Sequence, residues 1–242
     1  MNSLHRALAI LNFIGSREMP VSPRQIAAAL HIPLSTVYRL LNILKLWELV
    51  SHAKTYGTYT VGAQSLKTAN PYRRHSLPAA RLRPLTEALA KECGETVAVV
   101  VCNLYETICV DIIEAERTLR CSFEAGKSNT LLRGASGKTF LAFCSPQHRD
   151  LALQMPAHRL DDTGRECLLR ELAHIRRQGF GTSTGEIDEG VFGVSAPVFY
   201  RQELLAVLTV MAPAFRALPQ QAVLTAQVCA AAQKMSAWLN DE

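Results

Sequence analysis

The residues with the clearest chemistry form a polar cluster between positions 35 and 45. Hydroxyl, phenol, guanidinium, amide and ammonium groups recur there at helical spacing, in Ser35, Thr36, Tyr38, Arg39, Asn42 and Lys45. Such groups donate hydrogen bonds to phosphates and base edges, and a helix that presents them from its N-terminal half fits the major groove of DNA. The pattern predicts a DNA-reading helix, and an ordinary helical hairpin with a solvated face is the alternative.

Two short amphipathic segments are expected to position this cluster. Apolar residues recur at helical spacing in residues 23–30 and again in residues 34–46. The break His31-Ile32-Pro33 separates them, although glycine is commoner than histidine at this kind of turn. Two helices joined by such a short turn predict a helix-turn-helix motif.

A β-hairpin is predicted directly after the second helix. Residues 49–53 and 58–61 alternate as strands do, and Lys54 lies in the turn between them. An earlier helix is expected over residues 3–17, with Leu4, Leu8, Leu11 and Ile14 on one apolar face. The order helix, helix, helix, hairpin is that of a winged helix-turn-helix. Lys54 in the wing and Arg24 at the start of the second helix would contact phosphates.

Positive charge is concentrated at the N-terminal end of the chain. Residues 1–83 carry 11 Lys and Arg against Glu18 and Glu48, a net charge of +9, whereas the remainder carries 15 basic and 19 acidic residues, a net charge of −4. Basic side chains are needed to neutralise DNA phosphates. The asymmetry therefore favours DNA binding by the N-terminal region.

A composition change near residue 70 predicts a boundary between two domains. Residues 70–78 contain two prolines, a pair of arginines and other polar side chains. We expect a DNA-binding domain over residues 1–69, ending in a short helix over residues 64–69, then a linker over residues 70–78. A second domain is expected over residues 79–242.

The second domain is predicted to be α+β. Its closely spaced strands favour an antiparallel sheet, and strands, helices and further strands in this order favour an α+β fold. The expected strands are residues 95–102, 107–113, 119–123, 194–199 and 204–211. The expected helices are residues 79–93, 136–143, 147–154, 165–177 and 219–239.

Several patterns suggest catalysis without meeting its requirements. Residues 134–139 read GASGKT, but a phosphate-binding loop needs glycine at the position of Leu132. Glu186 and Asp188 lie beside glycines, where carboxylates more often cap a turn than act as paired acid and base. The serines lack the G-x-S-x-G elbow of a hydrolase. We expect no catalytic residue, and a helix start at Gly134 whose N–H groups could hold a ligand carboxylate.

The cysteines and histidines give no sign of a metal or disulfide framework. The seven cysteines are scattered without C-x-x-C spacing, which favours reduced thiols and a cytoplasmic protein. The seven histidines do not join them at metal-ligand spacing, so neither a metal nor a cofactor is expected. No segment has the apolar length of a membrane span, and the first residues do not resemble a signal peptide.

Segments along most of the chain resemble the IclR family of bacterial transcription regulators. They are SLHRALAIL at residues 3–11, HIPLSTVYRLLNIL at 31–44, YTVG at 59–62, LLRGASGKTFLA at 131–142, GFGTSTGEIDEGVFGVSAPVF at 179–199 and LAVLTVMAP at 205–213. The resemblance implies a winged-helix domain joined to a GAF-like effector domain. It also implies a homodimer or homotetramer on palindromic operator DNA, and a small organic acid as effector.

The resemblance also implies where the effector binds. Carried over by position, the pocket residues are Arg133, Gly134, Ala135, Ser183, Gly193, Thr209 and Met211. The family commonly has Asp or a similar polar residue at Ser183, Cys at Gly193 and Ser near Met211. Because these changes enlarge and neutralise the cavity, we expect a sugar acid or an aromatic acid rather than a short keto acid. Arg133 would pair with the effector carboxylate; alternatively, it is a surface arginine or a salt-bridge partner of a carboxylate such as Glu186.

The sequence therefore predicts a transcriptional regulator, repressor or activator, of a catabolic operon. An enzyme acting on a small molecule or nucleotide, with an incidental helical hairpin, is the alternative. A module that binds RNA or protein is a third possibility, but the chain lacks the interleaved aromatic residues of an RNA-binding sheet.

Overall fold

The computed structural model describes residues 2–76, 81–103, 105–155, 158 and 160–241. The chain divides into two compact units, Met1–Arg74 and His75–Glu242. The division falls inside the segment 70–78 that was expected to join two domains.

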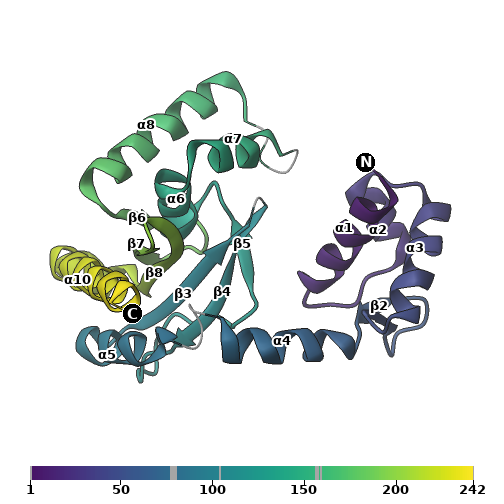
Figure 1. The fold of residues 1–242 in the computed structure, drawn as a ribbon, viewed down its shortest axis with the longest axis horizontal. Coiled ribbons are helices and arrows are strands. Elements are labelled where there is room, and N and C mark those ends of the chain that lie inside the picture. Colours follow the sequence, from purple (N-terminus) through teal and green to yellow (C-terminus); the bar gives the residue numbers. More distant parts are fainter. Residues whose placement is uncertain (1, 77–80, 104, 156–157, 159, 242) are drawn as a thin grey trace. The chain divides into compact units, whose positions relative to one another are not determined.

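The N-terminal unit contains three helices, a two-stranded sheet and a fourth helix (Figure 1). These elements are α1 (Ser3–Gly15), α2 (Pro23–Leu30), α3 (Leu34–Leu46), β1 (Val50–His52), β2 (Tyr59–Val61) and α4 (Gln64–His75). The two strands are antiparallel, and Val21 extends the hairpin by pairing with Tyr59. The predicted winged helix-turn-helix order is therefore present.

Local sequence explains where α2 begins and ends. Ser22 and Gln25 form a capping box, in which each side chain bonds the other residue's backbone N–H, and Pro23 occupies the first turn. The helix ends at His31, which adopts the left-handed conformation with φ of 52°. The axes of α2 and α3 differ by 116° across this break. This geometry is that of a helix-turn-helix.

A small apolar core holds the N-terminal helices together. Ile26 of α2 and Val37 of α3 are fully buried in it, as the spacing predicts. Leu11 and Ile14 of the predicted apolar face of α1 pack in this core, but the prediction was wrong for Leu4 and Leu8, which are 68% and 57% exposed. Ile10, which the sequence did not assign to that face, packs inward as well.

Helix α4 is longer than predicted. It runs from Gln64 to His75 with Pro71 inside it, whereas the sequence indicated a helix ending at residue 69. Proline inside a helix costs one backbone hydrogen bond, so its presence argued for a break. Residues 77 and 78 of the expected linker lie outside the described residues.

The C-terminal unit is built on one six-stranded sheet of order β5-β4-β3-β8-β7-β6, in which every neighbouring pair is antiparallel. The strands are β3 (Thr96–Cys102), β4 (Glu106–Ile113), β5 (Ser128–Thr130), β6 (Gly181–Thr184), β7 (Val191–Tyr200) and β8 (Glu203–Pro213). The helices are α5 (Arg83–Cys93), α6 (Gly134–Phe143), α7 (Pro146–Gln154), α8 (Asp162–Gln178), α9 (Ala214–Ala217) and α10 (Gln221–Asn240), with a 3-10 turn over Leu218–Gln220.

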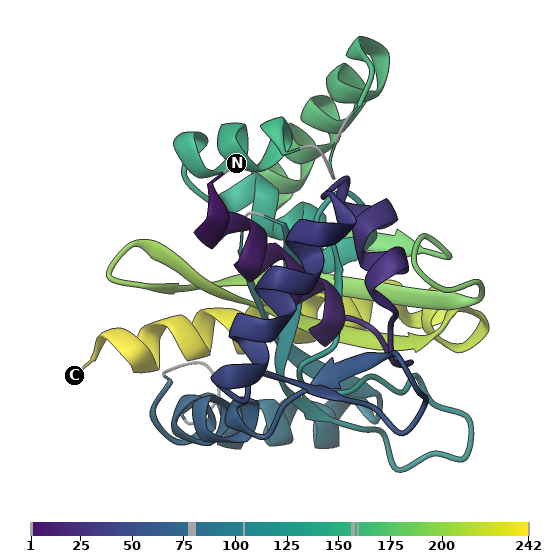
Figure 2. The ribbon, with the colours of Figure 1, turned by 90° about the vertical axis from the view of Figure 1, so that its right-hand side faces the viewer.

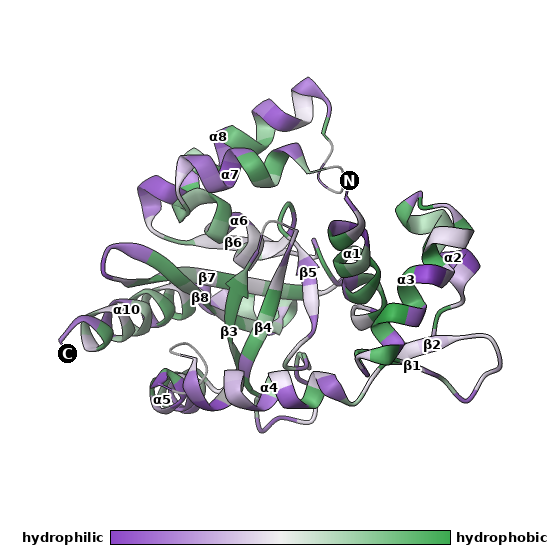
Figure 3. Ribbon diagram, turned by 45° about the vertical axis from the view of Figure 1, so that its right-hand side comes forward, coloured by the Kyte–Doolittle hydropathy of each residue, from purple (hydrophilic) through white to green (hydrophobic). Residues whose placement is uncertain are grey.

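The helices of this unit lie in two layers on opposite faces of the sheet. Figures 1 and 2 show α5 and α10 on one face and α6, α7 and α8 on the other. Figure 3 shows mostly hydrophobic residues along β3 and β4, and mostly polar residues along α4. Among the described residues no single helix has the length and apolar character of a membrane span, although the bent pair α2 and α3 meets that test by length and composition.

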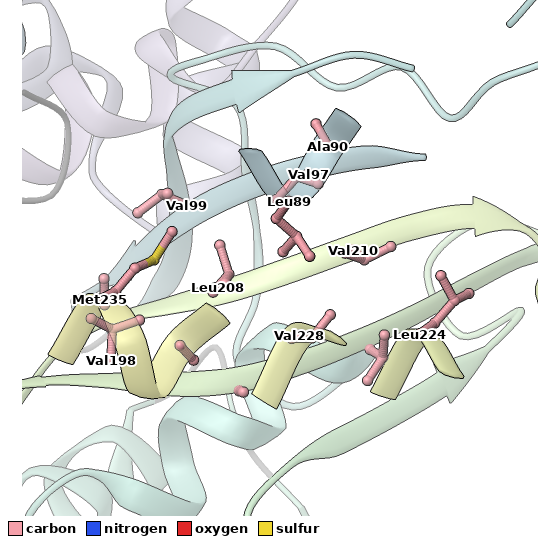
Figure 4. Close-up of a cluster of buried hydrophobic side chains, with 14 of the residues drawn as sticks. Leu89, Ala90, Val97, Val99, Val198, Leu208, Val210, Leu224, Val228 and Met235 are labelled. Atoms are coloured by element: carbon pink, nitrogen blue, oxygen red, sulfur yellow. The ribbon is translucent and has the colours of Figure 1, made fainter. Parts of the chain in front are cut away.

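The main core lies between the sheet and the layer of α5 and α10. In Figure 4, Val198 and Leu208 from the sheet meet Val228 and Met235 from α10, with Leu89 of α5 beside them. All five side chains are at most 2% exposed. The apolar spacing within residues 219–239 predicted Leu224, Val228 and Met235 on this face, but it also placed Trp238 there, which is 39% exposed.

Two predictions for the C-terminal unit were wrong. Residues 119–123 are not a strand but an irregular segment, and the next strand along the chain is β5, which pairs with the edge of β4 that faces away from β3. Helix α5 begins at Arg83, and residues 79 and 80 of its predicted start lie outside the described residues. β6, which the sequence did not predict, forms the far edge of the sheet.

The turn residue His31 offers a test of the helix-turn-helix geometry. The left-handed conformation costs an L-residue about 1–2 kcal/mol, and the greater freedom of unfolded glycine offsets part of this. We therefore expect His31→Gly to raise the free energy of unfolding by about 0.5 kcal/mol, measured by calorimetry of the full chain. The control Ala28→Gly, on the exposed face of α2, should lower it by about 1 kcal/mol. A destabilising His31→Gly would show that the imidazole itself holds the turn.

Candidate nucleic-acid interface and ligand pocket

The predicted recognition face of α3 is accessible. Ser35, Tyr38, Arg39 and Asn42 are exposed, whereas Thr36 is half-buried. They lie opposite the buried stripe of Val37, Leu40, Leu41 and Leu44. The Arg39 guanidinium donates only a long 3.4 Å hydrogen bond to Ser3 Oγ, so it can swing toward a DNA base or phosphate.

The wing places a second basic group near this face. Lys54 is exposed in the turn between β1 and β2, beside the fully exposed Tyr56. Gly57 has a φ of 75°, the left-handed conformation that lets the turn close. Arg24 is exposed in the first turn of α2, as expected for a phosphate contact.

Lys45 differs from the other predicted contacts. It is half-buried, and its Nζ lies 2.7 Å from His52 Nε2 on β1. The ring of His52 packs on Tyr59, with centroids 4.7 Å apart. Lys45 therefore links the recognition helix to the wing, a role that the sequence did not suggest.

A cavity of about 470 Å³ opens between one end of the sheet and the start of α6. Strand register supplies its floor, because Ser183 of β6 pairs with Gly193 of β7, which pairs with Met211 of β8. Thr209 lies two residues before Met211 on the same side of β8. Gly134 and Ala135 at the start of α6 complete the predicted set that lines the cavity.

Arg133 does not line this cavity. It is the residue before α6, in extended conformation, and its side chain is exposed. Of the two alternatives for Arg133, the surface position agrees with the structure, whereas pairing with Glu186 is wrong, because that carboxylate bonds to Lys138 and to the Gly134 N–H. Arg133 is exposed although the next residue, Gly134, lines the cavity. Sequence spacing does not reveal this difference, because it depends on the local turn into α6.

The first N–H groups of α6 already have acceptors within the chain. The Gly134 N–H donates to Glu186 Oε2 at 2.9 Å, and the Ala135 N–H donates to Ser183 Oγ at 3.0 Å. Gly134 has a φ of +80°, and a Cβ there would lie 2.9 Å from Cγ1 of Ile187. The helix start and the loop 185–190 therefore pack directly on one another.

A buried lysine ties three elements together beside the cavity. Lys138 of α6 is 3% exposed, and its Nζ lies 2.5 Å from Glu171 of α8 and 2.6 Å from Glu186. Burial by itself lowers the pKa of Lys138, but the hydrogen bonds to the two carboxylates outweigh it and leave the pKa raised. Lys138 is therefore charged and fixed in place.

A second buried ion pair holds the irregular segment 119–123 against the sheet. Glu95 is 0% exposed and receives a bidentate pair of hydrogen bonds from Arg216, at 2.6 and 2.8 Å. Arg216 also donates to the Leu119 carbonyl, and Thr96 Oγ1 donates to the Cys121 carbonyl. The whole segment 119–123 lines the cavity. The sequence does not reveal this wall, because the composition of residues 119–123 predicts a strand.

The described residues show how the cysteines, the histidines and the GASGKT segment are placed. They contain no group of three or more His, Cys, Asp and Glu side chains placed to hold a metal ion. Burial raises the pKa of the Cys109 thiol to about 12, so it stays protonated and is a poor nucleophile. The GASGKT segment starts α6 with its lysine buried in ion pairs, so that lysine is not free for a phosphate.

Two family patterns match this chain. The one described as "Bacterial transcriptional regulator IclR C-terminal" matches residues 75–237, and the "IclR helix-turn-helix domain" matches residues 3–52. The chain belongs to the IclR family. It is therefore a transcriptional regulator of the IclR type with a DNA-binding helix-turn-helix. The predicted two-domain fold, with its winged helix and its antiparallel sheet flanked by helices, is confirmed.

Individual IclR relatives cover nearly the whole chain. The "Probable transcriptional regulator SauR" of Cupriavidus necator is 29% identical over 87% of this chain and 86% of its own length. The crystal structure of an IclR family regulator from Brucella abortus superposes with a TM-score of 0.82, at 20% identity, covering 98% of this chain and 92% of that one. An IclR homologue from Microbacterium hydrocarbonoxydans, solved with 4-hydroxybenzoate, has a TM-score of 0.68 at 19% identity and covers both chains fully.

The Lys138 cluster gives a stability prediction. Lys138→Met removes the cation that Glu171 and Glu186 share, and we expect a loss of about 2 kcal/mol in the free energy of unfolding, since both carboxylates keep some contact with water. Because the folded pKa lies above the ordinary 10.5, the contribution is complete below that pH and is lost as pH rises through the folded pKa. The difference from wild type, measured by urea unfolding, should thus be equal at pH 7 and pH 9. Lys91→Met, at an exposed position of α5, should change little, and an equal effect of the two variants would contradict the role of the cluster.

Proposed function

We propose that this IclR-type regulator binds operator DNA through the exposed face of α3 and the wing, and controls a catabolic operon. Arg39 and Asn42 read base edges, together with Ser35, Thr36 and Tyr38. Arg24, Lys45 and Lys54 contact phosphates. The observation that carries the proposal is the accessible row of donors on α3, opposite a stripe buried in the core. The net charge of +9 over residues 1–83 supports it.

The cavity of the C-terminal unit binds a small organic acid in this proposal. Its volume suits a ligand of that size, and its wall combines hydroxyl groups with apolar side chains. The Microbacterium homologue solved with 4-hydroxybenzoate shows that an IclR-type protein can hold an aromatic acid. Gly193 leaves room for a sugar acid or an aromatic acid rather than a short keto acid.

Control of transcription follows if acid binding and DNA binding are coupled. The regulator acts as a homodimer or homotetramer on a palindromic operator, and the acid changes the spacing of paired winged helices. The coupling is then a free energy that each ligand exerts on the affinity of the other. Catabolic control is the setting in which an acid of this kind reports on nutrient supply.

The DNA proposal is tested by binding titrations on an operator selected from random duplexes by the wild-type protein. Arg39→Ala should cost about 1–3 kcal/mol of specific affinity and relax selectivity at one base pair. Lys54→Ala should weaken specific and non-specific binding alike, and lower the slope of log affinity against log salt by about 1. Lys91→Ala, on the C-terminal unit, should change neither. An Arg39→Ala protein with unchanged selectivity would remove Arg39 from the base-reading set.

The size of the cavity is tested at Gly193. A Cβ there would lie 3.4 Å from Ser183 Oγ and 3.6 Å from Ala135 Cβ, so it fits without displacing backbone. We expect Gly193→Val to keep the melting temperature but to lower affinity for a ring-sized acid such as benzoate about tenfold or more, because the added methyl groups fill the pocket. Affinity for pyruvate should be unchanged. Equal benzoate affinity in calorimetry would show that the ligand does not approach Gly193.

A further inference from the structure

We infer that the effector is a ring-bearing monocarboxylic acid whose carboxylate pairs with Arg120, on the irregular segment 119–123. The inference rests on the proposed function, since it assumes that the cavity binds an acid. It assigns the anchoring role to a residue that lies on the wall opposite α6 and was absent from the predicted set.

A carboxylate that leaves water needs charge-assisted hydrogen bonds in return. Among the lining residues that the structure describes, Arg120 is the one lysine or arginine. Lys138 is close, but it is buried between two carboxylates of the chain itself. Arg133 is exposed and lies outside the lining.

The first two N–H groups of α6 do not serve as the anchor while the observed contacts hold. They donate to Glu186 and Ser183. An incoming carboxylate there would have to displace Glu186, which is also bound to Lys138. The geometry therefore directs the charged end of the ligand to the other wall.

Arg120 is oriented for this task by its neighbours. Its Nε donates to Glu114 Oε2 at 2.8 Å, and its Nη1 donates to the Arg117 carbonyl at 3.4 Å. Glu114 is held in turn by Ser122 Oγ at 2.6 Å, and the hydrogen bonds from Ser122 and Arg120 lower its pKa, so it stays ionised. In the described part of the chain, Nη2 makes no hydrogen bond. The guanidinium can therefore donate from Nη1 and Nη2 to a carboxylate in the bidentate manner.

The rest of the lining selects the remainder of the ligand. Apolar side chains from four separate segments face the cavity, namely Leu119, Phe123, Ile187, Val191, Met211 and Phe215. They suit a ring better than a chain of hydroxyl groups. Asp188 and Glu189 also line the cavity and would repel a second carboxylate. Hence we infer one acid group and a neutral distal end near Ser183.

The test uses calorimetric titration of the full-length protein with benzoate, its neutral isostere benzamide, and gluconate. Wild type should bind benzoate better than benzamide or gluconate. Arg120→Gln should weaken benzoate binding about tenfold or more, in line with a lost charge-assisted pair, and leave benzamide binding unchanged. Arg120→Lys, which keeps the charge without the fork, should lie between the two. The matched control Arg133→Gln should bind benzoate as wild type does.

Several results would overturn the inference. They are benzoate affinity that survives Arg120→Gln, an equal loss in Arg133→Gln, benzamide binding as tight as benzoate, or no benzoate binding by wild type. Melting temperatures of the variants separate a lost contact from a lost fold. Gluconate binding without benzoate binding would overturn the inference that the effector bears a ring, but it would agree with the proposal that the effector is an acid. No binding of either acid would count against the acid effector as well, and the operator titrations judge the DNA proposal independently.

Discussion

The ligand cavity depends on one buried cation. Lys138 projects from α6 between Glu171 on α8 and Glu186 on the loop that joins β6 to β7. A lysine at 3% exposure is tolerated only with such partners, because an unpaired buried charge is strongly destabilising. Because Lys138 bonds to both carboxylates, α6, α8 and the loop between β6 and β7 meet at this lysine. Glu186 then reaches the Gly134 N–H, which places the loop directly on the start of α6.

The opposite wall of the cavity relies on the same principle. Glu95 has no contact with water, and the fork of Arg216 satisfies both of its oxygens. Arg216 also holds the Leu119 carbonyl, so an irregular segment acquires a defined path without strand pairing. The two buried ion pairs thus fix the backbone of the cavity walls, as regular backbone hydrogen bonds fix the strands of the sheet. The floor between them is supplied by antiparallel register, which aligns Ser183, Gly193 and Met211 in one row.

The DNA-binding unit is organised differently, by a small apolar core. The core fixes α3 through its buried stripe and leaves the opposite face free. The contact between Lys45 and His52 then joins the recognition helix to the wing. In such a unit, the groups that contact DNA are held by packing on the other side of their own helix.

The sequence by itself determined the features that depend on local periodicity and chain order. Helix spacing predicted α2 and α3 with their buried faces and most of the buried face of α10, and two apolar segments predicted the central parts of the long strands β7 and β8. Motif order indicated the family, and the family resemblance indicated seven pocket residues, six of which line the cavity. Only the tertiary structure decided the rest, because long-range ion pairs and hydrogen bonds overrode local preference. Residues 119–123 have strand-like composition, yet Arg216 and Thr96 hold them as a wall. Arg133 and Lys138 are both basic and five residues apart, yet the turn into α6 exposes the first and buries the second between two carboxylates.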